Sequence, residues 1–243
     1  MLIESMRPSK PDIEEWKRKS KWFRAHGSSR EHERHVENAE RALVRFGSTK
    51  TYCGVSWGKD SVVVADIVTR LAPEIPLVWV RVSPIENPDC FLVRDAFLSL
   101  HDRVNYHEIV VQYDSGSDEG TGRLSSGFRQ AASRFGTRYI SGVRGDESAS
   151  RSRRVAHWGE NTKNTCAPLA RWSAVDVFAY SLTRGLPIAP AYACLVNGLL
   201  DPCKIRIATL GGERGTGHGR ASWEWRYYPQ EMEKLFPNDR RQR

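Results

Sequence analysis

The hexapeptide Ser56-Trp57-Gly58-Lys59-Asp60-Ser61 contains the residue types that a phosphate-binding loop needs. A short β-prone run leads into it, and an apolar helical stretch follows it. The N–H groups of a tight turn and the positive end of a helix attract anions, and Lys59 adds a mobile positive charge. Gly58 allows close backbone approach, and the two serine hydroxyls can donate to phosphate oxygens. The segment therefore predicts an anion site between a strand and a helix.

The same segment differs from the common P-loop in two respects. The first glycine of that loop would fall at Cys53, and Lys59 is followed by Asp60, where the P-loop has Ser or Thr. The sequence therefore does not predict a Walker-type cradle for β- and γ-phosphates.

A second charged segment, Gly142-Val143-Arg144-Gly145-Asp146-Glu147-Ser148, follows an expected strand, and Arg151 lies just beyond it. In an open parallel sheet such a loop opens onto the same crevice, at the carboxyl ends of the strands, as residues 56–61. Guanidinium groups bind phosphate or sulfate through paired N–H bonds, which lysine does less well. We therefore expect Arg144 and Arg151 to clamp an anion.

The elements that must position these loops follow from sequence periodicity. Residues 11–46 have a helical pattern that is interrupted at 27–29 and ended by Gly47. Strands are expected at 51–56, 76–82, 106–111 and 137–141, and helices at 61–71, 91–100, 124–135 and 173–183. This alternation predicts an α/β fold, an open and mainly parallel sheet with helices on both faces. The expected parts are an N-terminal helical extension (1–48), a nucleotide-binding domain (49–190) and a less regular C-terminal segment (191–243).

Composition restricts the classes of partner and the compartment. The net charge of +8 and the pI near 9.4 favour an anionic partner such as a nucleotide, sulfate or nucleic acid. Acidic residues interleaved through residues 11–46 favour a solvated helical surface over a nucleic-acid arm there. We expect no secretory signal, because residues 1–8 have no apolar region after a basic one, and no membrane partner, because no run of about 18 apolar residues occurs. Five cysteines without a Cys-x-x-Cys pair favour a reducing cytoplasm over a disulfide scaffold or a zinc ribbon.

Four segments resemble one known family. Residues 56–61 resemble the pyrophosphate loop of the adenine nucleotide α-hydrolase (PP-loop ATP pyrophosphatase) superfamily, which usually has glycine where Trp57 stands. Residues 85–89 resemble the Glu-x-Pro-Glu/Asp segment of its phosphoadenosine phosphosulfate (PAPS) reductase branch, although Ser83-Pro84 replaces the Asp-Thr that often precedes it. Residues 142–148 resemble Gly-x-Arg-x-x-Glu-Ser, and residues 168–177 resemble Pro-Leu-x-x-Trp-Ser/Thr-x-x-Asp-Val. Matches in this order indicate a member of the PAPS reductase family.

The resemblance implies a site for an adenine nucleotide. It gives Lys59, Asp60 and Arg144 catalytic roles, and it implies Mg²⁺ bound to the phosphates of ATP without a dedicated protein metal site. The expected nucleotide contacts are Ser56, Trp57, Gly58, Lys59, Asp60, Ser61, Val82, Glu86, Gly142, Arg144 and Arg151. In the fourth segment, Ser173 and Asp176 form a predicted helix capping box, which favours a structural role.

The activity that the resemblance implies is cleavage of ATP between the α- and β-phosphates, which leaves an adenylylated substrate. The expected purpose is sulfur transfer. Nucleic acid is one candidate acceptor, as in the DNA phosphorothioation proteins of this family, and a sulfur-donor protein or a larger complex is the expected protein partner. True sulfonucleotide reductases use a cysteine near the C-terminus, usually in Glu-Cys-Gly, whereas the last cysteine here is Cys203, in Asp-Pro-Cys-Lys. A PAPS or adenylyl-sulfate reductase and a non-catalytic nucleotide-binding subunit are the alternatives.

Two features leave alternatives open. Cys166, Cys194 and Cys203 could hold an iron–sulfur cluster, although buried structural thiols are the favoured interpretation. The C-terminal segment could bind a phosphate backbone and stack bases of DNA or RNA, although packing of its aromatic residues on the sheet is favoured. Its basic and aromatic residues are Arg206, Arg214, Arg220, Trp223, Trp225, Arg226, Tyr227 and Tyr228.

Overall fold

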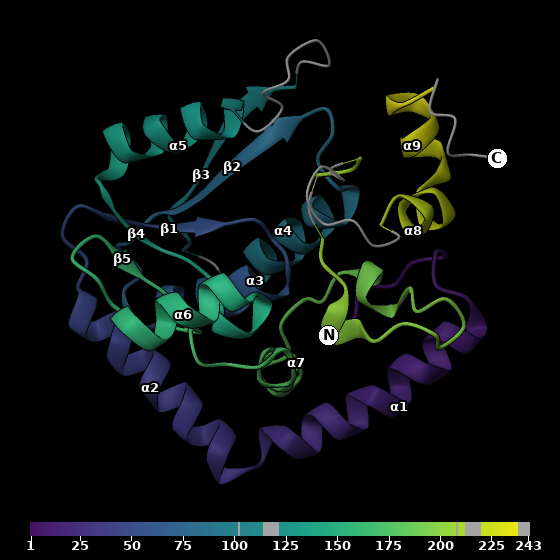
Figure 1. Ribbon diagram of the computed structural model, residues 1–243, viewed down its shortest axis with the longest axis horizontal. Coiled ribbons are helices and arrows are strands. Elements are labelled where there is room, and N and C mark those ends of the chain that lie inside the picture. The colour runs from purple at the N-terminus through teal and green to yellow at the C-terminus, as the bar shows by residue number, and fades with distance from the viewer. Residues whose placement is uncertain (102, 114–121, 208, 212–219, 238–243) are drawn as a thin grey trace.

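The central element is a sheet of five parallel strands in the order β3-β2-β1-β4-β5. The structure, a computed structural model, describes residues 1–101, 103–113, 122–207, 209–211 and 220–237 (Figure 1). The strands are β1 (Thr51–Val55), β2 (Leu77–Ser83), β3 (Tyr106–Gln112), β4 (Arg138–Ile140) and β5 (Thr165–Cys166). The first strand in the chain, β1, is central. Strands β2 and β3 follow on one side of it, and β4 and β5 lie on its other side, so the strand order reverses between β1 and β4.

The two faces of the sheet are covered by different helices (Figure 1). Side chains alternate along β2, so Leu77 and Trp79 join the large core cluster whereas Val78 and Val80 face α5 (Gly122–Phe135). A Cβ atom at Gly127 of α5 would lie 2.4 Å from a methyl carbon of Val80, so glycine is needed for this close approach. The opposite face packs on α3 (Lys59–Leu71), which in turn packs against α7 (Ala174–Thr183).

The N-terminal helices α1 (Lys10–Gly27) and α2 (Arg30–Phe46) form a V-shaped pair beneath α7 (Figure 1). Ser9 caps α1, and α2 ends at Gly47, whose φ of 76° favours glycine. Phe23 stacks on Phe178 of α7 with ring centroids 4.9 Å apart. This pair of N-terminal helices therefore shares one hydrophobic core with the sheet domain.

Two buried carboxylates fasten the C-terminal helices α8 (Arg220–Tyr227) and α9 (Pro229–Leu235) to the rest of the chain. Asp89, on α4 (Pro88–Leu100), accepts hydrogen bonds from Arg7 and from the hydroxyl of Tyr228. Asp12, on α1, accepts a hydrogen bond from the hydroxyl of Tyr227. The aromatic side chains of the C-terminal segment are thus bonded into the core.

The predicted fold class is confirmed, with helices on both faces of a parallel sheet. Sequence periodicity missed α6 (Ala149–Trp158), β5, α8 and α9. Strand β5 has two residues, and Val155 is the buried residue of α6, so neither element has a periodic apolar pattern to detect. No helix in the described part of the chain is both long enough and apolar enough to cross a membrane.

Candidate nucleotide-binding site

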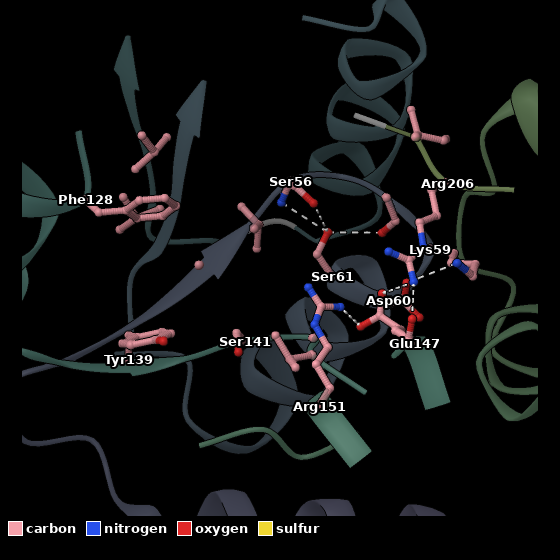
Figure 2. A pocket seen from close by; sticks show the side chains of 18 of the residues that line it. Ser56, Lys59, Asp60, Ser61, Phe128, Tyr139, Ser141, Glu147, Arg151 and Arg206 are labelled. Atoms are coloured by element: carbon pink, nitrogen blue, oxygen red, sulfur yellow. Dashed lines mark hydrogen bonds and ion pairs between the residues drawn. The ribbon is translucent and has the colours of Figure 1, made fainter. Parts of the chain in front are cut away.

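A cavity of about 380 Å³ opens where the strand order reverses, at the carboxyl ends of β1 and β4 (Figure 2). Open α/β sheets bind ligands at this position, because the loops that leave the two central strands diverge there. The lining side chains change character from one side to the other. The charged end comprises Lys59, Asp60, Glu147, Arg151 and Arg206, and the aromatic end comprises Tyr52, Phe128 and Tyr139.

The loop between β1 and α3 forms the centre of the cavity. Gly58 is the N-cap residue of α3, and among the described residues no side chain caps this helix. The hydroxyl of Ser61 donates to the carbonyl oxygen of Gly58 at 3.0 Å and accepts from the N–H group of Ser56 at 3.2 Å. These bonds fix the loop shape, so the positive end of α3 faces the cavity without a competing carboxylate cap.

Lys59 carries its ammonium group into the charged end. The Nζ atom lies 3.2 Å from Oδ2 of Asp60 and 5.5 Å from the ring centroid of Tyr192, and its side chain is only 3% exposed. The hydroxyl of Tyr192 accepts a hydrogen bond from the backbone N–H of Lys59 at 3.0 Å. Tyr192 therefore holds the start of α3 from the opposite wall, a role that its sequence context did not reveal.

Arg144 lies behind Asp60 and is not among the described residues that line the cavity. Its Nε atom donates to Oδ1 of Asp60 at 2.6 Å, and its guanidinium group also pairs with Asp146. Burial alone lowers the pKa of Arg144, but the two carboxylates outweigh it and raise that pKa overall. The expected direct clamp on an anion is therefore replaced by a buried ion pair that fixes the carboxylate of Asp60.

Two partly exposed arginines stand at the charged end instead. Arg151 pairs with Glu147, and Arg206 donates from Nη2 to the carbonyl oxygen of Glu147 at 2.8 Å. Their side chains are 40% and 48% exposed, so both retain N–H groups near solvent. Arg151 thus lines the cavity as expected, whereas Arg206 was assigned to the C-terminal tail. Glu147 belongs to the motif at residues 142–148, but the motif alone did not indicate that its side chain lines the cavity.

The aromatic end was not anticipated. Tyr52 of β1 and Tyr139 of β4 are paired residues on adjacent strands, with ring centroids 6.1 Å apart. Phe128 of α5 is 50% exposed and lies across from Tyr139 in Figure 2. This end presents flat apolar surface of the kind on which a nucleobase stacks.

Gly142 allows the loop after β4 to contact the start of α3. A Cβ atom at this position would lie 2.8 Å from the carbonyl carbon of Asp60 and 3.0 Å from the backbone nitrogen of Ser61. A larger residue would therefore push the two halves of the charged end apart. The close approach gives a physical reason for glycine at this motif position.

Besides Arg144, three further residues expected to contact nucleotide are not among the described lining residues. The side chain of Trp57 is fully buried against Trp79, Phe97 and Tyr106, and so does not face the cavity. Val82 is also buried, and its backbone N–H donates to Glu86 at 3.1 Å. Burial raises the pKa of Glu86 to about 7. Trp57, Val82 and Glu86 therefore support the loops around the cavity through packing.

The described cysteines show no reactive or clustered thiol. Cys53 on β1 and Cys166 on β5 are separated by β4, because both pair with Ile140, whereas Cys194 neighbours Asp89 and Cys203 neighbours Asp201. Burial raises the pKa of Cys166 and of Cys203 to about 12, which disfavours the thiolate. These separate surroundings favour structural thiols over a shared iron–sulfur cluster.

The C-terminal segment divides into packed aromatic residues and cationic residues. Trp223, Tyr227 and Tyr228 are buried, and Trp225 packs partly buried against the same core, so base stacking by these rings is not supported. Arg226 lies over the ring of Tyr227 at 5.6 Å. Arg214 and the side chain of Arg220 lie outside the described residues.

No protein-family model matches the sequence, and no curated protein matches it significantly. Two solved structures have a weaker likeness. The U34-tRNA thiolase NcsA from Methanococcus maripaludis, solved with its 4Fe–4S cluster, has a TM-score of 0.43 and 17% identity over 63% of this chain and 65% of its own. NMN synthetase from Francisella tularensis has a TM-score of 0.44 and 11% identity over 64% and 70%.

A third solved structure is more similar over a longer stretch. It is the phosphoadenylyl-sulfate (PAPS) reductase from Candida auris in a phosphate complex. The TM-score is 0.50 and the identity is 14%, over 75% of this chain and 96% of the reductase. The chain therefore shares its fold with this PAPS reductase.

Proposed function

We propose that the chain is an enzyme that binds ATP in this cavity and transfers its adenylyl group to an acceptor, releasing pyrophosphate. The observation that carries the proposal is one cavity with an aromatic end, a helix N-terminus and a cationic end arranged in sequence along it. The base would lie against Phe128 and Tyr139, and the phosphates would extend across Ser56 towards Lys59. This order of surfaces matches the order of groups in an adenine nucleotide.

The residues of the charged end suit charge that develops on a leaving pyrophosphate. An acceptor oxygen forms a bond to the α-phosphorus atom, the bond from that atom to the bridging oxygen breaks, and its electron pair leaves with pyrophosphate. Lys59 and the N-terminus of α3 would stabilise that charge. Asp60 would steer the ammonium group of Lys59, because Arg144 holds the carboxylate in place from behind.

Mg²⁺ fits the acidic residues of the cavity. Asp60 and Glu147 are the carboxylates among its described lining residues, and their side chains are 19% and 11% exposed. Mg²⁺ commonly binds one or two carboxylates together with substrate phosphates and water. When bound with ATP it would neutralise phosphate oxygens. The N-terminus of α3 would still orient the phosphates, and Asp60 would still hold Lys59.

The acceptor of the adenylyl group in this proposal is a polyanion such as DNA or RNA. Adenylylation would prepare it for sulfur transfer. The support is the pair of exposed arginines at the cavity, Arg151 and Arg206, together with Arg153 and Arg154 on the exposed side of α6. Guanidinium groups in such an arrangement bind phosphate backbones. The raised thiol pKa of Cys203 argues against the reductase alternative, which needs a thiolate.

The test is to incubate the purified chain with ATP and Mg²⁺, alone and with DNA or tRNA, and to separate the nucleotides by chromatography. AMP and pyrophosphate are expected, and ADP with phosphate would contradict the proposal. Lys59→Ala should abolish most product, whereas the exposed Lys163→Ala serves as the matched control. ATP binding without turnover under every condition would instead support a non-catalytic nucleotide-binding subunit.

A further inference from the structure

Three histidines converge on one carboxylate oxygen outside the nucleotide cavity. Oδ1 of Asp176 lies 2.8 Å from Nε2 of His26, 3.2 Å from Nδ1 of His32 and 3.3 Å from Nδ1 of His35. Asp176 and His32 are buried, and the side chains of His26 and His35 are each 25% exposed. The arrangement brings together the last turn of α1, the start of α2 and the first turn of α7.

Local structure fixes this arrangement from both sides. Oδ2 of Asp176 accepts hydrogen bonds from the N–H and the hydroxyl of Ser173, at 2.8 Å and 2.6 Å, which directs Oδ1 towards the histidines. Gly27 allows the end of α1 to lie close to α7, since a Cβ atom there would lie 2.8 Å from Cγ2 of Thr183. The ring of Trp172 packs against His32 and His35 and limits their rotation.

Hydrogen bonding within the group leaves one nitrogen unexplained. His26 and His32 both bond to Oδ1 of Asp176, whereas Nδ1 of His35 is a buried atom without a hydrogen-bond partner among the described residues. Buried polar atoms are normally paired, so this nitrogen points to a ligand. Close by, two imidazole nitrogens, from His26 and His32, and one carboxylate oxygen, from Asp176, form a donor set typical of zinc, with the fourth position left for water.

We propose that His26, His32 and Asp176 bind one Zn²⁺ ion, which clasps α1 and α2 to α7. A tetrahedral ion with bonds of about 2.0–2.1 Å holds its ligand atoms roughly 3.3 Å apart. The separations from Oδ1 to Nε2 of His26 and to Nδ1 of His32 are 2.8 and 3.2 Å, close to that spacing. Nε2 of His26, Nδ1 of His32 and the carboxylate oxygen also lie within 4.8 Å of one another.

The ion would have a structural role that does not depend on the proposed adenylyl transfer. Its three protein ligands would come from three helices that pack in the same core, and none of these residues lines the nucleotide cavity in the described part of the chain. A metal that joins elements in the folded state and finds no preformed site in the unfolded chain raises the stability of the fold.

The test uses the full chain, stripped with a chelator and titrated calorimetrically with Zn²⁺, with Mg²⁺ as the control ion. One Zn²⁺ per chain should bind, and Tm should rise by about 5 °C or more at roughly a hundredfold excess over Kd. Co²⁺ in the same protein should give the visible absorption of a tetrahedral site. Mg²⁺, which prefers oxygen ligands, should bind there no more than background.

Variants locate the ion. His26→Ala and His32→Ala should each weaken Zn²⁺ binding by about 10²-fold or more, exceeding the usual effect of losing a residue beyond the ligands. His157→Ala, an exposed histidine on α6, should leave it unchanged. If His32→Ala does not fold, the partly exposed His26→Gln provides the same comparison with little loss of packing. Absence of Zn²⁺ binding, or equal binding in wild type and the His26 variants, would overturn the proposal.

Discussion

At the charged end of the nucleotide cavity the lining residues come mostly from short continuous segments, whereas at the aromatic end they come from three distant elements. Lys59 and Asp60 are adjacent in the chain, and Glu147 and Arg151 are one helical turn apart. Tyr52, Phe128 and Tyr139 lie on β1, α5 and β4 and are brought together by strand pairing and helix packing. The two ends therefore differ in how visible they are in a sequence.

The difference follows from the physical origin of each end. Anion binding depends on local backbone shape, a helix start and a nearby cation, which all belong to one short segment. Base stacking needs only a flat apolar face, and many arrangements of distant residues supply one. We expect the charged end to control the chemical step and the aromatic end to control nucleotide affinity.

The largest expected effect is that of Lys59→Ala on turnover. Removal of the ammonium group should lower kcat by about 10²-fold or more, because charge on the leaving pyrophosphate loses its nearest cation. Affinity for AMP, which lacks the pyrophosphate, should change little. Pyrophosphate release and AMP binding are the measurements, with Lys163→Ala as the control. An equal loss of AMP binding would show that the charged end also holds the nucleoside.

Arg144→Ala should reduce stability more than Arg151→Ala does, although both are arginines of one motif region. Loss of the buried guanidinium removes the ion pair with Asp146 and leaves Lys59 as the ion-pair partner of Asp60, at a cost of about 1–3 kcal/mol. Arg151 is 40% exposed, so its ion pair with Glu147 contributes less than about 1 kcal/mol. Urea unfolding of both variants measures the difference. Equal destabilisation would contradict a buried positioning role for Arg144.

These two arginines also mark the limit of sequence reasoning at the charged end. Their nearness to Lys59 followed from the rule that loops at the carboxyl ends of parallel strands share one crevice. Which of them faces the ligand depends on side-chain packing around Asp60, and the motif carries no information about that. Arg206 comes from residues beyond the resemblance, so no motif connected it with Glu147.

The aromatic end could not be predicted for a different reason. Tyr52 and Tyr139 are 87 positions apart, and they meet because β4 pairs with β1 in a particular register. The fold class was predictable, since alternation of strands and helices requires only periodicity. The pairing of individual residues across strands requires the three-dimensional arrangement.

Phe128→Ala should weaken ATP binding by roughly tenfold while leaving kcat nearly unchanged, because loss of one stacking surface costs about 1–3 kcal/mol. Phe128 is 50% exposed, so the fold should tolerate the change. Trp22→Ala removes a ring of similar exposure from α1 and serves as the control. Calorimetric Kd values and initial rates separate the two quantities. A fall in kcat with an unchanged Kd would place the base elsewhere.

Glu86→Gln should alter stability against pH without altering ATP affinity, because the carboxyl is a support rather than a contact. Its folded pKa of about 7 exceeds the ordinary value of 4.5, since burial favours the protonated form. Its stabilising contribution is therefore complete below pH 4.5 and is lost as the pH rises through 7. Glu86→Gln should be more stable than wild type at pH 8 by about 1–3 kcal/mol, and no more stable at pH 4.5. Urea titrations at the two pH values test this prediction. A changed Kd for ATP in Glu86→Gln would instead indicate that Glu86 contacts the nucleotide.

The smallest expected effect concerns the surface beside the charged end and tests whether the acceptor is a nucleic acid. Arg153 and Arg154 are exposed on α6, next to Arg151, and do not line the cavity among its described residues. If both contact phosphates, the double alanine variant should reduce the slope of log Kobs against log salt by about 1.8 for duplex DNA, at about 0.9 per phosphate. ATP affinity should stay constant, because these side chains approach the acceptor and not the nucleotide.

Two exposed cations on α1, Arg18 and Lys21, form the matched control pair, and their replacement by alanine should leave the slope unchanged. The control removes the same net charge from the chain, so it separates local contact from the general attraction of a basic protein for DNA. Equal slopes for the two double variants would mean that net charge alone attracts the polymer. A reduced slope for the α6 pair alone would place the polyanion beside the residues that hold the leaving pyrophosphate, where an acceptor for the adenylyl group must lie.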